Sequence, residues 1–487
     1  MKVRRLKFLF MILLVLFVLV FPVGAEVEFS PDLFDELADS INEIPYVETP
    51  AYKRIELDNG MVVYLAVDDE LPLVEVVGYI KGGSSQESLE LAGISSIMTR
   101  LMNTGTKNYN EAELSRYKEL NGVNFNIYSS YDRYNFSANS LSMDQEALIA
   151  LIAEILRNPE FEATYHSRIL QEYYQVLLQQ YYYDFSLLEM FFNTILYGEH
   201  PYAYSDNIGL VISALERMTP AQLGTYYQQT IDPANLVMAI SGDFDLQEME
   251  AIITQEFGDW ESKGVELKEE KVVIDEANFN RIVLINKEDA THAKMKIGYN
   301  FYASGFEDEV PFLMANQIFG GGDFSSRLMD NLRSERGYVY GIYSGVTYNQ
   351  QGGLYYISTD VAPDKACEIL AAVRAEMLAI KEGEEKISAE ELFKNVNLNN
   401  AFFPKSYTNQ ISVLAKLMFD QEIMDKDKDS INNFIKAYND LTPAQVQEVF
   451  DKHTFPERFF TLIVGKKADI LPAFQEQGLA VEVIELF

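Results

Sequence analysis

Apolar and polar residues near the start of the chain predict a β-hairpin. Polar and apolar side chains alternate from Arg54 to Leu57, and the run from Met61 to Val67 is apolar throughout. Between them lies Asp58-Asn59-Gly60, which is typical of a tight turn. A further apolar-rich stretch, Leu73 to Ile80, predicts a third strand.

Beyond these strands, apolar residues recur at intervals of three and four, the spacing of an amphipathic helix. Helices are predicted over residues 89–103, 111–121, 143–157 and 163–181. A second set of elements begins with predicted strands near 281–286 and 294–302. Strands followed by helices in this order are typical of an α+β fold, and we predict antiparallel sheets covered by helices.

The chain contains an internal repeat. Thr219-Pro220-Ala221-Gln222 recurs later in the chain as Thr442-Pro443-Ala444-Gln445, and a proline and a glycine then follow at the same spacing in both copies. Each copy predicts a threonine-capped helix with proline at its first position, then a turn and a strand. The repeat therefore indicates two homologous halves of about 220 residues.

The length of 487 residues also favours more than one domain, because single cores stop growing near about 300 residues. We expect a signal peptide (1–25), an N-terminal arm (26–50), a first domain (51–260), a linker (261–278) and a second domain (279–487). The composition, 48% hydrophobic and 23% charged, is that of an ordinary folded protein.

The leader, residues 1–25, has the three parts of a secretory signal. Four basic residues precede an apolar run from Phe8 to Phe21, which ends in Val23-Gly24-Ala25. We expect export to the periplasm or the extracellular space. Because the apolar run is shorter than the roughly 20 residues that span a bilayer, cleavage is favoured over a retained membrane anchor, which stays open as the alternative.

The net charge and the cysteine content limit the kinds of partner and the covalent cross-links that this chain can have. The formal net charge is −35, and loss of the four basic residues of the leader would make it −39. Nucleic acid is an unsuitable partner, because so acidic a protein repels phosphate. The single cysteine, Cys367, excludes an internal disulfide, and we interpret it as a buried structural residue.

A segment of the first half carries a family motif. Gly82-Gly83 and Glu87 separate the third predicted strand from a helix that closes with Gly105-Thr106. This arrangement resembles the pitrilysin/insulinase family of zinc metallopeptidases, which includes the mitochondrial processing peptidases. In active members the helix carries H-x-x-E-H, whose two histidines bind Zn²⁺ from one helix face while the glutamate acts as general base. The resemblance extends over residues from about 51 to 487.

The metal-binding positions of that motif have different residues in this chain. Counted back from Gly105, they are Ser96, Thr99 and Arg100. Two hydroxyls and a permanent cation are not normal zinc ligands, so we predict no metal and no cofactor on this chain. The family's third ligand, a glutamate on a later helix, has no clear equivalent, and Glu172 is the only acid near that position.

The four histidines are too far apart in sequence to form a short metal motif. They are His166, His200, His292 and His453. His200 lies in Gly198-Glu199-His200-Pro201, which resembles a recurrent turn of the family, and we assign it a structural role.

The second half carries another motif of the same family. Gly320-Gly321-Gly322, which we interpret as a helix-to-helix turn rather than a phosphate loop, precedes Arg333 and Tyr340. In active relatives an arginine and a tyrosine seven residues apart reach across a chamber, hold the substrate backbone and stabilise the oxyanion. The resemblance assigns this substrate-binding role to Arg333 and Tyr340. The alternative is that Arg333 pairs with a nearby acid and Tyr340 packs on a sheet.

Clustered tyrosines offer a further candidate surface. Tyr173-Tyr174 and Tyr181-Tyr182-Tyr183 could line a peptide channel, but aromatic residues at helical spacing more often pack in a core, and we favour packing.

These observations lead to one hypothesis and two alternatives. The chain resembles the non-catalytic subunit of a heterodimeric zinc metallopeptidase, in which a homologous partner bearing H-x-x-E-H supplies the zinc and both bind a peptide or unfolded segment. The first alternative is a catalytically dead scaffold or peptide-binding protein of the same fold. The second is solitary peptidase activity, which requires about one zinc per chain.

Overall fold

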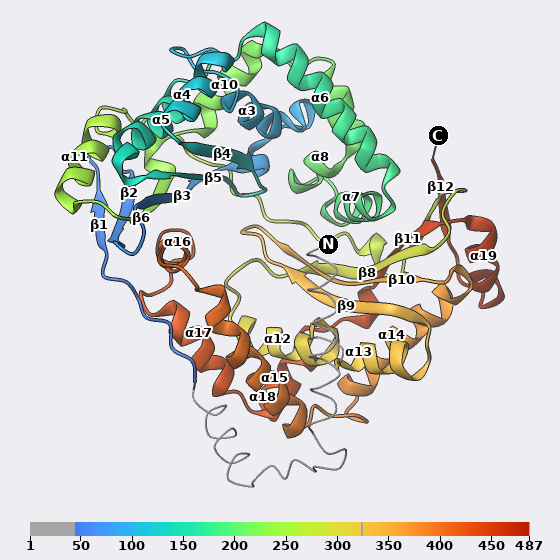
Figure 1. The fold of residues 1–487 in the computed structure, drawn as a ribbon. Helices are drawn as coiled ribbons and strands as arrows, with labels where there is room; N and C mark the ends of the chain where they lie inside the picture. The colour runs from blue at the N-terminus through green and yellow to red at the C-terminus, as the bar shows by residue number, and fades with distance from the viewer. Residues whose placement is uncertain (1–43, 323–324, 487) are drawn as a thin grey trace, which may run out of the picture. The chain divides into compact units, whose positions relative to one another are not determined.

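Two mixed β-sheets, each covered by helices, form the framework of the chain (Figure 1). The computed structural model describes residues 44–322 and 325–486. The predicted signal peptide and residues 26–43 of the predicted arm lie outside the described residues. From Pro45 onward the chain forms one compact unit.

The first sheet has the strand order β1-β2-β6-β3-β5-β4. Its strands are β1 (Lys53–Glu56), β2 (Val62–Val67), β3 (Leu73–Lys81), β4 (Asn124–Ser129), β5 (Arg133–Leu141) and β6 (Leu236–Gly242). The helices of this half are α3 (Ile94–Met102), α4 (Glu111–Leu120), α5 (Gln145–Arg157), α6 (Ala163–Tyr182), α7 (Asp184–Tyr197), α8 (Tyr202–Asp206), α9 (Ile208–Leu215), α10 (Pro220–Thr230) and α11 (Leu246–Phe257).

The second sheet has the order β12-β7-β11-β8-β10-β9. Its strands are β7 (Ile282–Asn286), β8 (Ala293–Phe301), β9 (Val339–Thr347), β10 (Gly353–Val361), β11 (Phe460–Gly465) and β12 (Glu482–Glu485). The helices are α12 (Glu309–Asn316), α13 (Arg327–Met329), α14 (Ala366–Lys381), α15 (Ala389–Phe402), α16 (Gln410–Glu422), α17 (Ser430–Asn439), α18 (Pro443–His453) and α19 (Lys467–Glu476), with π-helical turns at Gln317–Gly321 and Asp330–Glu335.

The α+β fold class predicted from the sequence is confirmed, with one refinement of strand direction. The predicted hairpin β1-β2 and the predicted β3 are present, but β3 does not lie beside β2. Instead β6 inserts between them, parallel to β2 and antiparallel to β3. In the second half β7 runs parallel to both β11 and β12, so the first sheet has one parallel pair, the second has two, and the remaining strand pairs are antiparallel.

The internal repeat is visible in the structure. Thr219 and Thr442 cap α10 and α18 in the same way, each as part of a capping box with proline at the first helical turn. Each helix is followed by a short 3-10 turn and then by a strand that pairs in parallel with an earlier strand of its half, β6 with β2 and β11 with β7.

One helix of each half covers the sheet of the other half. Apolar side chains of α16 pack on β2 and β6 of the first sheet, and those of α7 pack on β7, β10 and β11 of the second. The α16 cluster contains Val62, Tyr64, Ala66, Val237, Ala239, Ile411, Leu414, Ala415 and Met418. The α7 cluster contains Leu187, Leu188, Phe192, Leu196, Tyr197, Val283, Ile285, Leu354, Phe460, Leu462 and Val464. In Figure 1 α16 lies beneath the first sheet, opposite α3, α5 and α10.

The exchanged helices occupy equivalent places in the repeat. When Thr219 is aligned with Thr442, α7 falls on positions 407–420, close to α16 at 410–422. Burying one leucine-sized side chain contributes about 1.5–3 kcal/mol, so several per helix make the two halves one cooperative unit.

Charged pairs reinforce both contacts between the halves. On α7 the Glu189 carboxylate lies 2.5 Å from the Lys296 ammonium of β8, which is only 3% exposed and stacks over the rings of Phe192 and Tyr356. Burial lowers the pKa of Lys296, which Glu189 opposes. On α16 Glu422 accepts hydrogen bonds from Arg54 at 2.8 Å and from the Tyr64 hydroxyl at 2.7 Å.

The described end of the N-terminal arm and the stretch between the halves also join them. Val47 exchanges two hydrogen bonds with the Asn432 side chain of α17, at 2.9 and 3.0 Å. Residues 261–275, in the predicted linker, contain neither helix nor strand. The buried His200 contacts this stretch, because its Nε2 lies 2.6 Å from the Glu270 carbonyl oxygen. Its other ring nitrogen, Nδ1, accepts from the Tyr202 N–H at 3.2 Å and so fixes the orientation of the ring.

Buried Glu87 fixes the start of α3, the helix that corresponds to the metal-motif helix. Its carboxylate accepts from the Gly93 N–H at 2.7 Å and from the Ser95 N–H and hydroxyl at 3.1 and 2.5 Å. These bonds satisfy donors that a helix N-terminus leaves open, where the helix dipole also favours a negative charge. Gly93 has φ of 83°, and an added Cβ would lie 2.9 Å from Val211, so the turn requires glycine.

The helix exchange predicts that Leu414→Ala destabilises the whole unit. Leu414 is fully buried against the first sheet, and truncating such a leucine costs about 2–5 kcal/mol. Denaturant unfolding should show this loss in a single transition reported by probes in both halves. Leu120→Ala, on the exposed face of α4, is the matched control and should change stability by about 0.5 kcal/mol or less. Unfolding of the first sheet alone in Leu414→Ala would contradict the account.

Glu87 predicts a defined pH dependence of stability. Burial raises the pKa of Glu87 from 4.5 to about 7. Between these values the folded protein binds more protons at Glu87 than the unfolded chain, so stability falls as the pH rises through this window. Relative to Glu87→Gln, the wild-type free energy of unfolding should decrease by up to about 1.4 kcal/mol per pH unit. Glu90→Gln, which alters an exposed acid, should leave the wild-type profile unchanged in shape. A difference between wild type and Glu87→Gln that is constant with pH would refute this role.

Candidate functional site

The three metal-motif positions of α3 are engaged in contacts within the protein. Thr99 is 2% exposed, and its hydroxyl donates to the carbonyl oxygens of Ser95 and Ser96 at 3.1 and 3.2 Å. The Arg100 guanidinium lies 4.8 Å from the centre of the Tyr173 ring, and Ser96 lines the same cavity as Tyr173. Ser96 and Arg100 are therefore directed towards α6, whereas Thr99 is directed back into its own helix.

The face of α6 towards α3 carries no acid. Tyr173 and Leu177 are buried there, and burial raises the pKa of the Tyr173 phenol. Glu172, the candidate third ligand, is exposed and pairs with Arg168 at 3.0 Å. Two hydroxyls, a guanidinium, a phenol and a leucine do not fit a zinc ion, which takes thiolate, imidazole or carboxylate ligands.

A cavity of about 450 Å³ opens beside Ser96, and we call it the motif-helix cavity. Its lining is mainly hydroxylic and includes Ser84, Ser96, Ser129, Ser130, Ser186 and Ser205, together with Tyr131, Tyr173, Gln180, Glu189 and Asp206. Both carboxylates are occupied, since Glu189 pairs with Lys296 and Asp206 accepts from Tyr131 and from Asn193. Burial raises the pKa of Asp206, which these hydrogen bonds partly offset.

The four histidines lie apart and have different surroundings. His200 is structural, as described above, His453 pairs with Asp308 at 2.7 Å, and His292 is exposed. His166 is buried, and burial lowers its pKa. Within residues 44–322 and 325–486 no group of three or more His, Cys, Asp or Glu side chains is close enough to hold a metal ion.

Arg333 and Tyr340 lie together in the second half. Arg333 is in the π-helical turn before β9, and its guanidinium is 5.4 Å from the centre of the Tyr340 ring. Tyr340 is 87% exposed at the start of β9, an edge strand, so the alternative that it packs on a sheet is wrong. Neither residue lines the motif-helix cavity.

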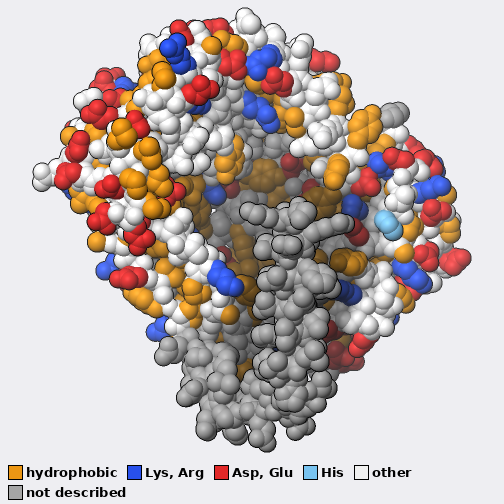
Figure 2. Space-filling view, viewed as in Figure 1, with side chains coloured by type: hydrophobic (Ala, Val, Ile, Leu, Met, Phe, Trp, Pro, Cys, Tyr) orange, Lys and Arg blue, Asp and Glu red, His pale blue; other side chains and the backbone are white. Residues whose placement is uncertain are grey.

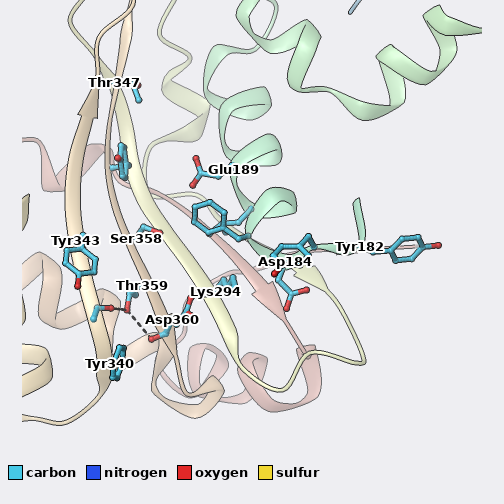
Figure 3. Close-up of a pocket in the computed structure, with 15 residues that line it drawn as sticks. Tyr182, Asp184, Glu189, Lys294, Tyr340, Tyr343, Thr347, Ser358, Thr359 and Asp360 are labelled. Atoms are coloured by element: carbon cyan, nitrogen blue, oxygen red, sulfur yellow. Dashed lines mark hydrogen bonds and ion pairs between the residues drawn. The ribbon is translucent and has the colours of Figure 1, made fainter. Parts of the chain in front are cut away.

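A second cavity, of about 860 Å³, extends from Tyr340 to the start of α7 (Figure 3). We call it the tyrosine cleft, after the aromatic residues Tyr182, Tyr183, Phe185, Tyr340, Tyr343 and Tyr356 in its lining. It adjoins the motif-helix cavity, because Phe185 and Glu189 line both. In Figure 3 Glu189 and Tyr340 are well separated along the cleft; Ser96 lines the motif-helix cavity, whereas Tyr340 lines the tyrosine cleft.

Some of the clustered tyrosines pack in a core and others line the cleft. Tyr173 and Tyr181 pack against cores, as expected from their helical spacing. Tyr182 and Tyr183 are instead 69% and 68% exposed and line the cleft, so for them the packing interpretation is wrong. The break between α6 and α7 at Tyr183 turns them outward, which helical spacing alone did not indicate.

Other cleft residues were not predicted from the sequence. Tyr343 and Tyr356 come from β9 and β10, neither of which the apolar pattern had predicted. The abundance of β-branched and aromatic residues within 339–347 and 353–361 is the signal that could have found them.

The cysteine, the helices and the surface charge also bear on the expectations from the sequence. Cys367 is buried in α14, in agreement with its structural interpretation, and burial raises its thiol pKa. No described helix has both the length and the apolar character needed to cross a membrane. Figure 2 shows acidic side chains spread over the visible face, with basic ones between them and no continuous basic surface.

Comparison with known proteins identifies the family. The model described as Insulinase (Peptidase family M16) matches residues 63–205, and the model described as Peptidase M16 inactive domain matches residues 217–398. An uncharacterized zinc protease of Mycobacterium leprae is 22% identical over 343 residues, which cover 69% of this chain and 75% of that protein. The non-peptidase homolog YmxG of Helicobacter pylori is 19% identical over 423 residues, which cover 82% of this chain and 95% of that protein.

A solved structure has the same fold. The crystal structure of a peptidase M16 inactive domain from Pseudomonas fluorescens matches with a TM-score of 0.75 at 22% identity, over 85% of this chain and 98% of that one. Since the two family models together match most of the chain between residues 63 and 398, and the fold agrees, the chain belongs to the M16 (insulinase) peptidase family, as an inactive member whose motif helix lacks the metal ligands.

Proposed function

We propose that this chain is the non-catalytic, substrate-binding subunit of a heterodimeric zinc metallopeptidase that acts on peptides or unfolded segments outside the cytoplasm. A homologous chain with an intact H-x-x-E-H motif supplies the zinc. Export rests on the leader-like sequence of residues 1–25.

The observation that carries the proposal is the contrast between the two motifs. At the first, Thr99 is buried and Arg100 stacks on Tyr173, a set of contacts that cannot bind Zn²⁺. At the second, Arg333 and Tyr340 remain side by side, with Tyr340 exposed on a cleft. A phenol held at the surface is more consistent with a retained binding role than with packing.

The position of the pair supports a site shared with another chain. Because Arg333 and Tyr340 do not line this chain's own motif-helix cavity, a reaction that used them would take place at a site completed by the partner. There the Arg333 guanidinium would bind peptide carbonyls, and the Tyr340 hydroxyl would donate a hydrogen bond to the oxyanion formed during hydrolysis.

A second candidate is a peptide-holding protein without any part in catalysis. It is favoured by one relative, which is named a non-peptidase homolog, and by the cleft, which lies within this one chain. In that case Arg333 and Tyr340 have no role in hydrolysis.

Substitution of the pair separates these functions. In a complex with an H-x-x-E-H partner, Tyr340→Phe should lower kcat for peptide cleavage by about 10²-fold, because it removes one hydrogen bond made to the transition state. Arg333→Ala should raise KM, because it removes a contact to the substrate backbone. Cleavage of a quenched fluorescent peptide by the co-purified complex measures both.

Arg336→Ala is the matched control, since Arg336 is an exposed arginine directly after the same turn, and its guanidinium donates to Asn331 at 2.6 Å. It should leave kcat and KM near those of the wild type. If no complex forms with any H-x-x-E-H homologue, or if Tyr340→Phe and Arg333→Ala both cleave normally, the subunit proposal fails.

A further inference from the structure

The tyrosine cleft gathers exposed aromatic rings from three separate elements. Tyr182 and Phe185 come from the end of α6 and the start of α7, and Tyr343 from β9. Phe185 and Tyr343 are 51% and 49% exposed, and Tyr182 is more exposed still. Single exposed aromatic residues are ordinary on protein surfaces, but convergence in one concave site marks a binding surface.

Every carboxylate of the cleft is matched by a lysine. Asp184 pairs with Lys287 at 3.0 Å and Asp360 pairs with Lys294 at 2.7 Å. Glu189 pairs with the buried Lys296, as described above. Each of the three carboxylates that line the cleft therefore has a lysine partner, although Lys287 is shared with Asp289 at 2.9 Å and the chain as a whole carries −35.

These ion pairs determine which peptide side chains the cleft can recognise. A basic side chain would have to compete with lysines already held at 2.5–3.0 Å, and it would gain little by replacing them. Tyrosine and phenylalanine rings instead offer large, rigid contact area that loses little conformational entropy on binding. The volume of about 860 Å³ is enough for several side chains.

We propose that the tyrosine cleft selects peptide segments by their aromatic and large apolar side chains, and not by their basic ones. This inference rests on the proposed peptide-binding function and names its substrate class.

Binding of matched peptides to the full chain, without a partner, tests the proposal. The probes are short, unstructured, fluorescent peptides that differ only at two positions, which are both Phe, both Ser or both Lys. Fluorescence anisotropy should show the Phe peptide binding about tenfold more tightly than either of the others, with little change between low salt and about 0.5 M salt. Tightest binding of the Lys peptide, weakened strongly by salt, would overturn the proposal.

Substitutions of cleft tyrosines test whether these rings cause the selectivity for aromatic side chains. Tyr182→Ser with Tyr343→Ser should weaken binding of the Phe peptide by about tenfold, since both rings are surface residues of the cleft. Tyr128→Ser is the matched control, because Tyr128 is a comparably exposed tyrosine of β4 that does not line the cleft. Equal binding by the double variant and the wild type would contradict the proposal.

Removal of one lysine charge from the cleft gives an independent readout. Lys294→Met leaves Asp360 without its lysine partner and should raise the affinity for the Lys peptide several-fold relative to the wild type. No gain for the Lys peptide would mean that the ion pairs do not set the selectivity.

These outcomes can be told apart from failure of the subunit proposal. Aromatic selectivity without any role of Tyr340 in cleavage would retain the cleft proposal and favour the peptide-holding function. Normal dependence of cleavage on Tyr340 without aromatic selectivity would retain the subunit function and reject the cleft proposal.

Discussion

The reciprocal packing of α7 and α16 is the constraint on which the rest of the structure depends. Each sheet has one face covered by helices of its own half and leaves the other face for a helix of the opposite half. Neither half can bury its apolar surface alone, so the duplicated chain folds as one unit. The same packing builds the cleft, because α7 brings Phe185 and Glu189 over a floor formed by β8, β9 and β10.

The motif helix α3 keeps its position in the fold although it lacks the metal ligands of the family. Glu87 and Gly93 hold α3 in place, and its apolar face packs in the first core, although its other face has no metal ligands. Stacking of Arg100 on Tyr173 and the internal hydrogen bonds of Thr99 stabilise the positions where ligands are absent.

Local patterns predicted much of the framework. The hairpin at Asp58-Asn59-Gly60, the helices of the first half and the duplicated Thr-Pro caps all depend on residues close in sequence, and the structure contains them. The helix exchange depends on which sheet an apolar helix face finally covers, and periodicity carries no such information. The placement of β6 could not be predicted for the same reason, since its parallel pairing with β2 joins segments that lie far apart in the sequence.

In the candidate site, too, residues close in sequence could be predicted and contacts between distant elements could not. The spacing of Ser96, Thr99 and Arg100 predicted that they lie on one helix, and the structure contains that helix; the close approach of Arg333 to Tyr340 was not predicted. The α6 residues beside Ser96, Tyr173 and Leu177, and the cleft residues of β9 and β10 were not identified, because they meet only through tertiary packing.

The central claim is that a family fold is retained here without its metal, and zinc stoichiometry tests this claim most directly. We predict that metal analysis finds no zinc in the purified chain after dialysis, and about one zinc per heterodimer once an H-x-x-E-H partner is bound. One tightly bound zinc in the isolated chain would contradict the account, because its motif-helix residues could not supply the ligands.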